Sequence, residues 1–141
     1  MFQISTRLRY GLRALIYIAA KSGCDSVNLH EVSEKELISR KYLENIFKLL
    51  KKGGIIKSVR GRDGGYTLAA KPEEITLYEI AAAIEGGISL IDCLGGKELC
   101  GKAAECGIRA FWGDYQDYIK KYLDNITLAE VMEKYMNISG E

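Results

Sequence analysis

The chain has little histidine, proline or tryptophan, with one of each among its 141 residues. It also contains no apolar run close to the roughly 20 residues that a membrane-spanning helix requires. Arginines interrupt the apolar N-terminal stretch, so this stretch lacks the continuous apolar core of a targeting signal. From these absences we expect an untargeted, cytoplasmic protein that makes no contact with a membrane.

The groups that catalysis needs are scarce as well. The only histidine, His30, is expected to face solvent at the start of a helix. No nucleophile and base stand at a characteristic spacing, and no phosphate-binding loop precedes a helix. We therefore do not expect an enzyme. With 48% hydrophobic residues and a single proline, the chain is long enough for one compact protomer.

Charge is distributed unevenly, although the formal net charge is only +1. Residues 1–72 contain 14 basic and 6 acidic side chains, whereas residues 73–141 contain 6 basic and 13 acidic ones. The two halves are therefore suited to different partners. We expect them to form two functional parts, 1–72 and 73–141, within the one protomer.

Apolar periodicity predicts a mainly helical chain. Apolar residues recur at helical spacing over residues 7–21 and again over residues 39–53. Between these segments, Asn28 with Glu31 three places on is typical of a capping box, and it predicts a short helix to about residue 36. Ser39 is a suitable N-cap for the longer helix that follows.

The helix expected over residues 39–53 has two contrasting faces. One face is apolar and must pack on a core, and the other carries Lys41, Asn45, Lys48 and Lys52. Residues 39–62 hold eight basic side chains and one acid, and such a run taken alone is most often a solvated helix face. The segment "IIKSVRGRDGGYTL" follows at once and predicts a hairpin with strands at 55–59 and 66–68. In this order the elements predict a winged helix-turn-helix that binds nucleic acid.

Three segments also carry a resemblance: "ISTRLRYGLRAL", "ISRKYLENIFKLLKKGGIIKSVRGRDGGYTLA" and "EEITLYEIAAAIEG". They resemble the corresponding stretches of a bacterial winged-helix family that includes the iron–sulfur cluster regulator IscR, the nitric-oxide-sensing repressor NsrR and the cysteine-metabolism repressor CymR. The resemblance covers nearly the whole chain. It implies a homodimeric transcription regulator that binds double-stranded DNA at a near-palindromic operator.

The resemblance places the start of a recognition helix at Ser39, Arg40, Lys41, Tyr42 and Asn45, and the wing at Arg60 and Arg62. By their chemistry, Arg40, Lys41 and Lys48 are expected to bind phosphates or guanine. Asn45 is suited to adenine and Arg60 to the minor groove, while Gly61 gives the wing its turn.

Some of these positions have a second interpretation. Tyr42 could serve packing alone. Glu44 either accepts a hydrogen bond from a cytosine amine or pairs with Lys48 one helical turn later. Arg7 and Arg9, on the first helix, either contact the DNA backbone or belong to a solvated surface.

The acidic half contains a long aromatic and aliphatic stripe on a helix expected over residues 110–125. Its members are Phe111, Tyr115, Tyr118, Ile119 and Tyr122. A stripe of this kind is usually core, but it exceeds what one small domain needs. We therefore expect a long dimerisation helix. A symmetric dimer would place two recognition helices about one DNA turn, roughly 34 Å, apart.

Cys93, Cys100 and Cys106 lie in a glycine-containing segment just before that helix. In a reducing compartment, clustered cysteines more often hold a metal or do redox chemistry than form structural disulfides. From the residues alone, three interpretations stay open: an iron–sulfur cluster or zinc, redox-active thiols, or incidental cysteines. The resemblance implies the cluster, because IscR-type and NsrR-type members have three cysteines here and CymR-type members generally lack them.

The fourth ligand departs from the family pattern. IscR-type relatives usually have a histidine three positions after the third cysteine, where this chain has Arg109. NsrR-type relatives use an aspartate on the first helix, and the corresponding position here is Arg9. Three acids flank the cysteines and could supply an oxygen, and these are Asp92, Glu98 and Glu105.

We expect a 2Fe–2S cluster, with a 4Fe–4S cluster as the second choice. The cluster would modulate operator binding at genes of cluster assembly or sulfur metabolism. The alternative is a cluster-free repressor of the same family, regulated by thiol redox chemistry or by a partner protein.

Overall fold

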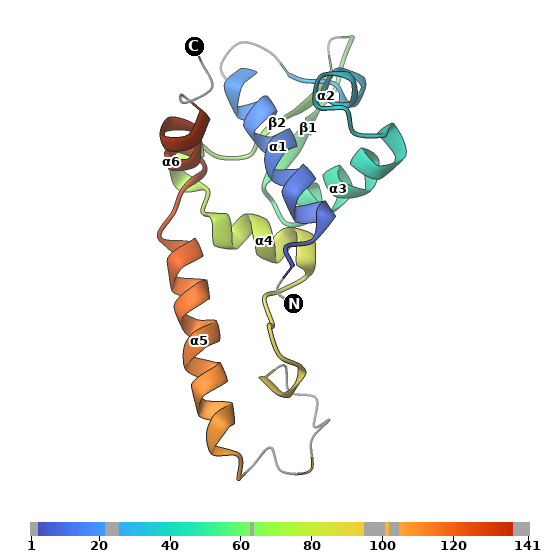
Figure 1. Cartoon of the computed structure of the whole chain (residues 1–141). Coiled ribbons are helices and arrows are strands. Elements are labelled where there is room, and N and C mark those ends of the chain that lie inside the picture. The colour runs from blue at the N-terminus through green and yellow to red at the C-terminus, as the bar shows by residue number, and fades with distance from the viewer. Residues whose placement is uncertain (1–2, 22–25, 63, 95–100, 102–104, 137–141) are drawn as a thin grey trace.

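The computed structural model describes residues 3–21, 26–62, 64–94, 101 and 105–136. Its main elements are α1 (Thr6–Lys21), α2 (Leu29–Glu36), α3 (Arg40–Lys52), β1 (Ile56–Val59), β2 (Gly65–Leu68), α4 (Leu77–Glu85), α5 (Gly107–Asp124) and α6 (Leu128–Val131). Three short helical turns complete the described structure: η1 (Pro72–Glu74) before α4, η2 (Asp92–Leu94) before α5, and η3 (Met132–Met136) after α6. The prediction of a mainly helical chain with one small hairpin is confirmed (Figure 1).

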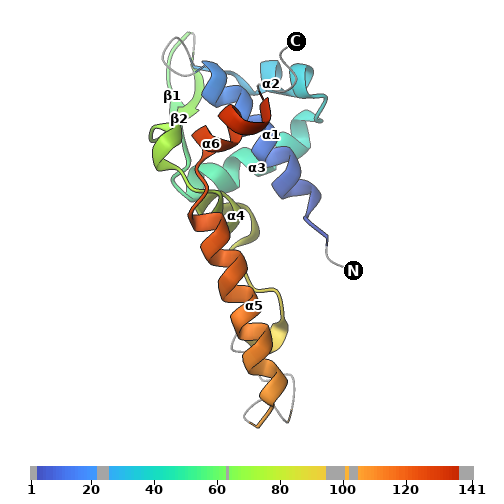
Figure 2. The same ribbon diagram turned by 60° about the vertical axis from the view of Figure 1, so that its left-hand side comes forward.

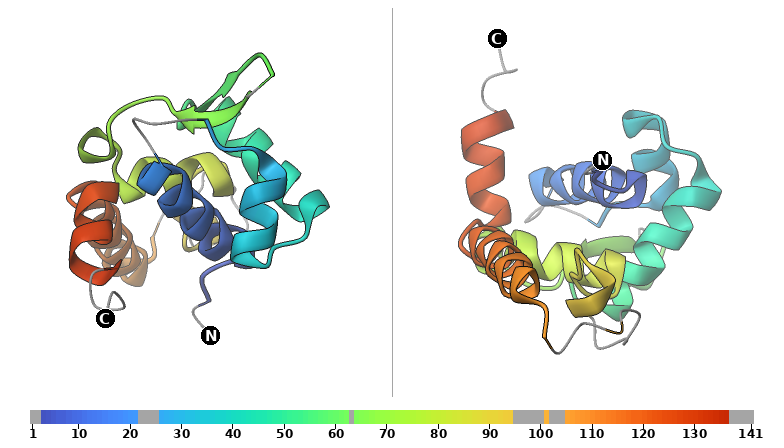
Figure 3. Two further views of the ribbon diagram at one scale, coloured as in Figure 1. Left: turned by 90° about the horizontal axis from the view of Figure 1, so that it is seen from above. Right: turned by 60° about the horizontal axis from the view of Figure 1, so that its bottom comes forward.

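Helices α1 to α4, the hairpin and α6 surround one apolar core (Figures 1 and 3). We call this group of elements the head. The apolar face predicted for α3 is buried through Leu43, Ile46, Phe47 and Leu50. Helix α4 adds Ile80 and Ile84, and α6 adds Leu128. Burying a side chain of this size contributes roughly 1.5–3 kcal/mol, so this face fixes which side of α3 remains exposed.

Side-chain caps begin the helices where the sequence places them. The side chains of Asn28, Ser39, Thr76 and Thr127 each accept a hydrogen bond from the backbone N–H three residues on. Thr76 and Thr127 form complete capping boxes. The box expected at Asn28 is only half formed, because Glu31 accepts a 2.6 Å hydrogen bond from the phenol of Tyr17 on α1 instead.

The turn between α2 and α3 is held by its own hydrogen bonds. Leu37 ends α2 in the left-handed region, with φ of 56°. The backbone N–H of Ile38 donates to the carbonyl of Ser33 at 3.2 Å, and the Ser33 hydroxyl donates back to the carbonyl of Ile38 at 2.6 Å. These bonds set the direction in which α3 leaves α2.

The hairpin pairs β1 and β2 antiparallel, with Ile56 opposite Leu68 and Val59 opposite Gly65. Val27 forms a bridge with Tyr66 beside it, through backbone hydrogen bonds of 2.8 and 2.9 Å. A Cβ atom on Gly65 would lie 2.4 Å from the carbonyl oxygen of Val27. Gly65, the second glycine of "GGY", is therefore required because the backbone of Val27 approaches too closely for a side chain.

Helix α5 leaves the head as a long arm (Figures 1 and 2). It spans Gly107–Asp124 and thus begins three residues before the predicted start. The chain before η2 runs beside it, where the backbone N–H of Leu90 donates to Oε1 of the buried Gln116 at 2.8 Å. After α5 the chain returns to the head, where the N–H of Leu128 donates to the carbonyl of Ile75 at 2.8 Å.

Within the described ranges, every helix is too short or too polar to cross a membrane.

Candidate nucleic-acid interface and cysteine segment

The face of α3 opposite the core is polar and exposed. Its exposed members include Arg40, Lys41, Glu44, Asn45, Lys48 and Lys52. The same helix buries its apolar face completely, so these side chains cannot turn inward without unpacking the head. The sequence prediction of a basic outer face on this helix agrees with the structure.

Ser39 and Tyr42 have local structural roles at the start of α3. The Ser39 hydroxyl accepts a 3.3 Å hydrogen bond from the backbone N–H of Tyr42. The half-buried ring of Tyr42 packs edge-on against Tyr10 of α1, with ring centroids 5.8 Å apart. Packing, one of the two interpretations open for Tyr42, is therefore observed.

Glu44 and Lys48 do not form the helical pair that was one of the two interpretations of Glu44. Among the described residues, the ion pairs within 4.0 Å do not include these two side chains. Both are exposed on the outer face of α3. The carboxylate of Glu44 thus lies exposed on a surface whose other charged side chains are basic.

The hairpin places Arg60, Gly61 and Arg62 in its exposed turn. Gly61 has φ of 124°, a conformation that side-chain-bearing residues rarely adopt. The strand β1 contacts α3, and the hairpin projects past the helices when the head is seen from above (Figure 3). The structure therefore joins the two parts that the sequence assigned to DNA binding.

Arg7 and Arg9 of α1, the two arginines considered for DNA binding, are held locally. Arg7 lies 3.6 Å from the carboxylate of Glu85 on α4, a carboxylate that also contacts the Ser5 hydroxyl. Arg9 donates a 3.2 Å hydrogen bond to the hydroxyl of Thr6 and is exposed. Arg7 therefore ties α1 to α4, whereas Arg9 remains at the surface.

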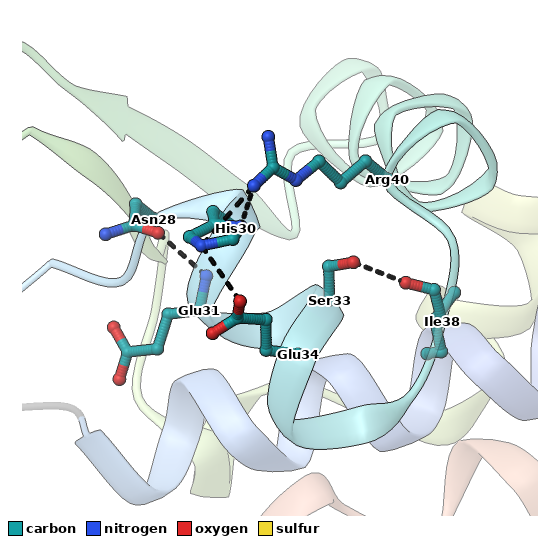
Figure 4. A network of polar contacts seen from close by, with 7 residues as sticks. All are labelled: Asn28, His30, Glu31, Ser33, Glu34, Ile38 and Arg40. Atoms are coloured by element: carbon teal, nitrogen blue, oxygen red, sulfur yellow. Dashed lines mark hydrogen bonds and ion pairs between the residues drawn. The ribbon is translucent and has the colours of Figure 1, made fainter.

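Sequence reasoning missed a contact of His30. The ring is exposed, as expected, but it contacts the guanidinium of Arg40 and the carboxylate of Glu34 (Figure 4). His30 and Glu34 stand one helical turn apart, which the sequence does show. Arg40 belongs to the next helix, and its approach depends on the turn at Leu37.

The cysteine segment is described at its two ends. Cys93 lies in η2 and Cys106 directly precedes α5, and both are half-buried free thiols. Nη2 of Arg109 donates a 2.9 Å hydrogen bond to the carbonyl oxygen of Cys93. Cys24, Glu98 and Cys100 lie outside the described residues. Of the two acids that remain, Asp92 falls within η2 and Glu105 is exposed.

The described residues test a cluster site only in part. They contain no group of three His, Cys, Asp or Glu side chains arranged to hold a metal. Two of the three expected thiol ligands are free, and Arg109 holds the backbone of Cys93 to the first turn of α5, next to Cys106. Thiolates suit an iron–sulfur cluster, but a guanidinium has no lone pair to donate. Within the described residues, Cys93 and Cys106 therefore stand as free thiols at the two ends of the cysteine segment.

An apolar row runs along α5. Phe111, Tyr118 and Tyr122 are 55%, 73% and 57% exposed, and Ile108 extends the row by one turn. Tyr115 is half-buried in the same row, where Trp112 packs edge-on against it and against Phe111. Ile119 lies to one side and lines an open cavity of about 810 Å³ between α1, α4 and α5.

A helix-turn-helix with an exposed basic second helix and an arginine-bearing hairpin defines a winged-helix regulator of transcription. Residues 4–134 match the Rrf2 family, described as iron-dependent transcriptional regulators. The chain belongs to this family. Its relatives carry names of transcriptional regulators and not of enzymes, as the sequence predicted.

Particular relatives agree with this assignment. The transcriptional regulator IscR of Aliivibrio salmonicida is 35% identical, over 92% of this chain and 77% of its own length. The structure of IscR from T. potens superposes with a TM-score of 0.78, at 29% identity, covering 98% of this chain and 91% of that one. The cysteine regulator CymR of B. subtilis superposes with a TM-score of 0.75, at 34% identity, covering 94% and 98%.

Proposed function

We propose that this Rrf2-family regulator binds near-palindromic double-stranded DNA as a homodimer, and that an iron–sulfur cluster modulates its binding. In this proposal residues 1–72 contact the DNA, and residues 73–141 carry the cysteines and the dimer contacts. The observation that carries DNA binding is the exposed polar face of α3 beside the arginine-bearing hairpin. A major groove roughly 12 Å wide admits such a helix.

The side chains of this face have complementary tasks in the proposal. Arg40, Lys41 and Lys48 neutralise phosphates or bind guanine, and Asn45 pairs with adenine. Arg60 enters the minor groove from the wing. Glu44 selects cytosine through a hydrogen bond from the base amine.

The apolar row of α5 supports the homodimer. Three large side chains of one helix face are more than half exposed, which is costly in water and typical of an interface. Pairing the row with its own copy about a twofold axis would cover it. The same axis would present two α3 helices to successive turns of one DNA face.

The cluster would be held by Cys93, Cys100 and Cys106. We propose a 2Fe–2S cluster, with a 4Fe–4S cluster as the second choice. When bound, it supplies a centre that oxidants, nitric oxide or iron shortage can remove. The three cysteines would draw residues 93–106 against the start of α5, where Arg109 already holds Cys93. Because α5 carries the proposed dimer contacts, this ordering would alter the placement of the two heads and hence operator affinity. Genes of cluster assembly or sulfur metabolism are the expected targets.

The test is to purify the protein without oxygen and to record its ultraviolet–visible and Mössbauer spectra, with iron and sulfide counted per chain. Cys100→Ala should lose the cluster, whereas Cys24→Ala, the matched control, should keep it. DNA affinity is then compared between cluster-loaded and cluster-free protein at one salt concentration. Equal affinities for every selected operator would refute cluster control while leaving DNA binding intact.

Two observations favour a second candidate, a cluster-free regulator that responds to thiol oxidation or to a partner protein. Arg109 stands where a ligand histidine is expected, and the fold is also similar to CymR. Protein that stays colourless after reconstitution, yet changes its DNA affinity with peroxide, would support this candidate.

A further inference from the structure

His30, Glu34 and Arg40 form a chain of polar contacts across the helix-turn-helix (Figure 4). Nη2 of Arg40 contacts Nδ1 of His30 and lies 3.3 Å from its Nε2. Nε2 of His30 lies 3.1 Å from Oε1 of Glu34, one helical turn further along α2. The side chains of His30 and Glu34 are 51% and 67% exposed, so the chain lies at the surface beside the polar face of α3.

The two outer partners approach the ring with opposite hydrogen-bonding chemistry. A guanidinium only donates hydrogen bonds, and an ionised carboxylate only accepts them. The ring of His30 therefore links Arg40 at the start of α3 to Glu34 on α2.

The local fold brings these three residues together. Asn28 caps α2 through a 2.8 Å bond and so places His30 in the first turn of that helix. The bonds between Ser33 and Ile38 fix the turn that leads to α3. Ser39 then caps α3, which makes Arg40 its first residue. The contact thus depends on helix ends that the structure holds firmly.

The contact leaves most of the arginine available. A guanidinium has five N–H donors, and His30 uses those on one terminal nitrogen only. The other terminal nitrogen points away from the ring (Figure 4). His30 therefore restrains Arg40 without occupying it, and a side chain restrained beforehand loses less conformational entropy when it binds.

We propose that His30 is a positioning residue for DNA recognition, which holds Arg40 ready at the N-terminal end of α3. The inference rests on the proposed DNA binding by α3 and does not depend on the cluster. Glu34 holds the other side of the ring, and Glu31 is already engaged by Tyr17 and Lys21 of α1. Loss of the ring would therefore release Arg40 and weaken DNA binding.

The single histidine makes this contact directly measurable. The chain holds no other imidazole, so the one pair of ring nitrogen signals in ¹⁵N-labelled free protein belongs to His30. These signals should shift on Arg40→Ala. Unchanged signals would overturn the contact.

The binding experiment uses a duplex selected by the wild-type protein from a random-sequence library. His30→Ala should weaken binding about two- to tenfold at pH 7.5, the range expected for one side chain that must be immobilised. Arg40→Ala should weaken it further, and the double variant should bind like Arg40→Ala alone. His30→Asn keeps a side chain that can accept a hydrogen bond from Arg40, so it should retain affinity.

The outcomes separate the two proposals. A protein that selects no duplex overturns DNA binding by α3 and this inference together. DNA binding with additive effects of His30→Ala and Arg40→Ala overturns the positioning role alone. Unchanged thermal unfolding of both variants guards against a folding defect.

Discussion

Arg109 holds Cys93 to the start of α5, through a 2.9 Å hydrogen bond from its guanidinium to the Cys93 carbonyl oxygen. The residue that replaces the expected histidine ligand is thus a tether between η2 and α5. It fixes the backbone of one cysteine next to the helix turn that begins after Cys106. This position therefore carries a backbone constraint where the family resemblance led us to expect a histidine.

Replacing Arg109 by histidine tests this relationship. If three cysteines hold a cluster, Arg109→His adds an imidazole ligand at the position usual in IscR-type relatives. The cluster should then persist longer in air, by at least severalfold, as measured by the decay of its visible absorption and by iron remaining per chain. Lys121→His, an exposed change farther along α5, is the control and should have no effect. An equal cluster lifetime in Arg109→His and wild type would contradict the prediction.

Leu37 provides a prediction about stability. It has φ of 56° and is 88% exposed, so its side chain adds backbone strain and gains no burial. A left-handed conformation costs a non-glycine residue roughly 1–2 kcal/mol, and glycine returns part of this through its larger entropy loss. Leu37→Gly should therefore raise the free energy of unfolding by about 0.5–1 kcal/mol in urea titrations. Lys35→Gly, within α2, should lower it by about 1 kcal/mol.

Tyr17 provides a pH dependence. The hydrogen bond to Glu31, aided by burial and by the charges of Glu31 and Glu36, raises the pKa of Tyr17 from 10.0 to about 12. The folded state therefore keeps a proton that the unfolded chain loses above pH 10, and this stabilising contribution disappears as pH rises toward 12. The difference in unfolding free energy between wild type and Tyr17→Phe should be constant below pH 10 and shrink between pH 10 and 12. A difference that grows over this interval would contradict the assignment.

Local periodicity explains why much of this fold could be predicted. The two faces of α3 follow from apolar spacing. Once Leu43 and Phe47 are buried, helical geometry leaves Lys48 exposed, independently of how the other elements pack. The caps at Ser39 and Thr76 are equally local.

Contacts between elements could not be predicted in the same way. Arg109 reaches Cys93 sixteen residues earlier in the sequence, and Arg40 reaches His30 across a turn whose geometry depends on Leu37. Arg13 of α1 pairs with Glu36 of α2 at 3.2 Å for the same reason, since only packing of the two helices brings them together. No spacing rule within one helix contains this information.

Tyr118 tests whether the apolar row of α5 is a dimer interface. It is 73% exposed, so the head gains almost nothing from its ring, whereas a partner copy could bury it. Tyr118→Glu should leave thermal unfolding of the protomer nearly unchanged and weaken self-association at least tenfold, since buried interface aromatics often contribute about 2 kcal/mol or more. Sedimentation equilibrium measures this directly. Asp117→Lys, also exposed but on another side of the helix, is the matched control for a charge change. A dimer unaffected by Tyr118→Glu would place the interface elsewhere. If the variant is instead a monomer and also loses operator affinity, the twofold pairing of α5 is what brings two α3 helices onto one DNA site.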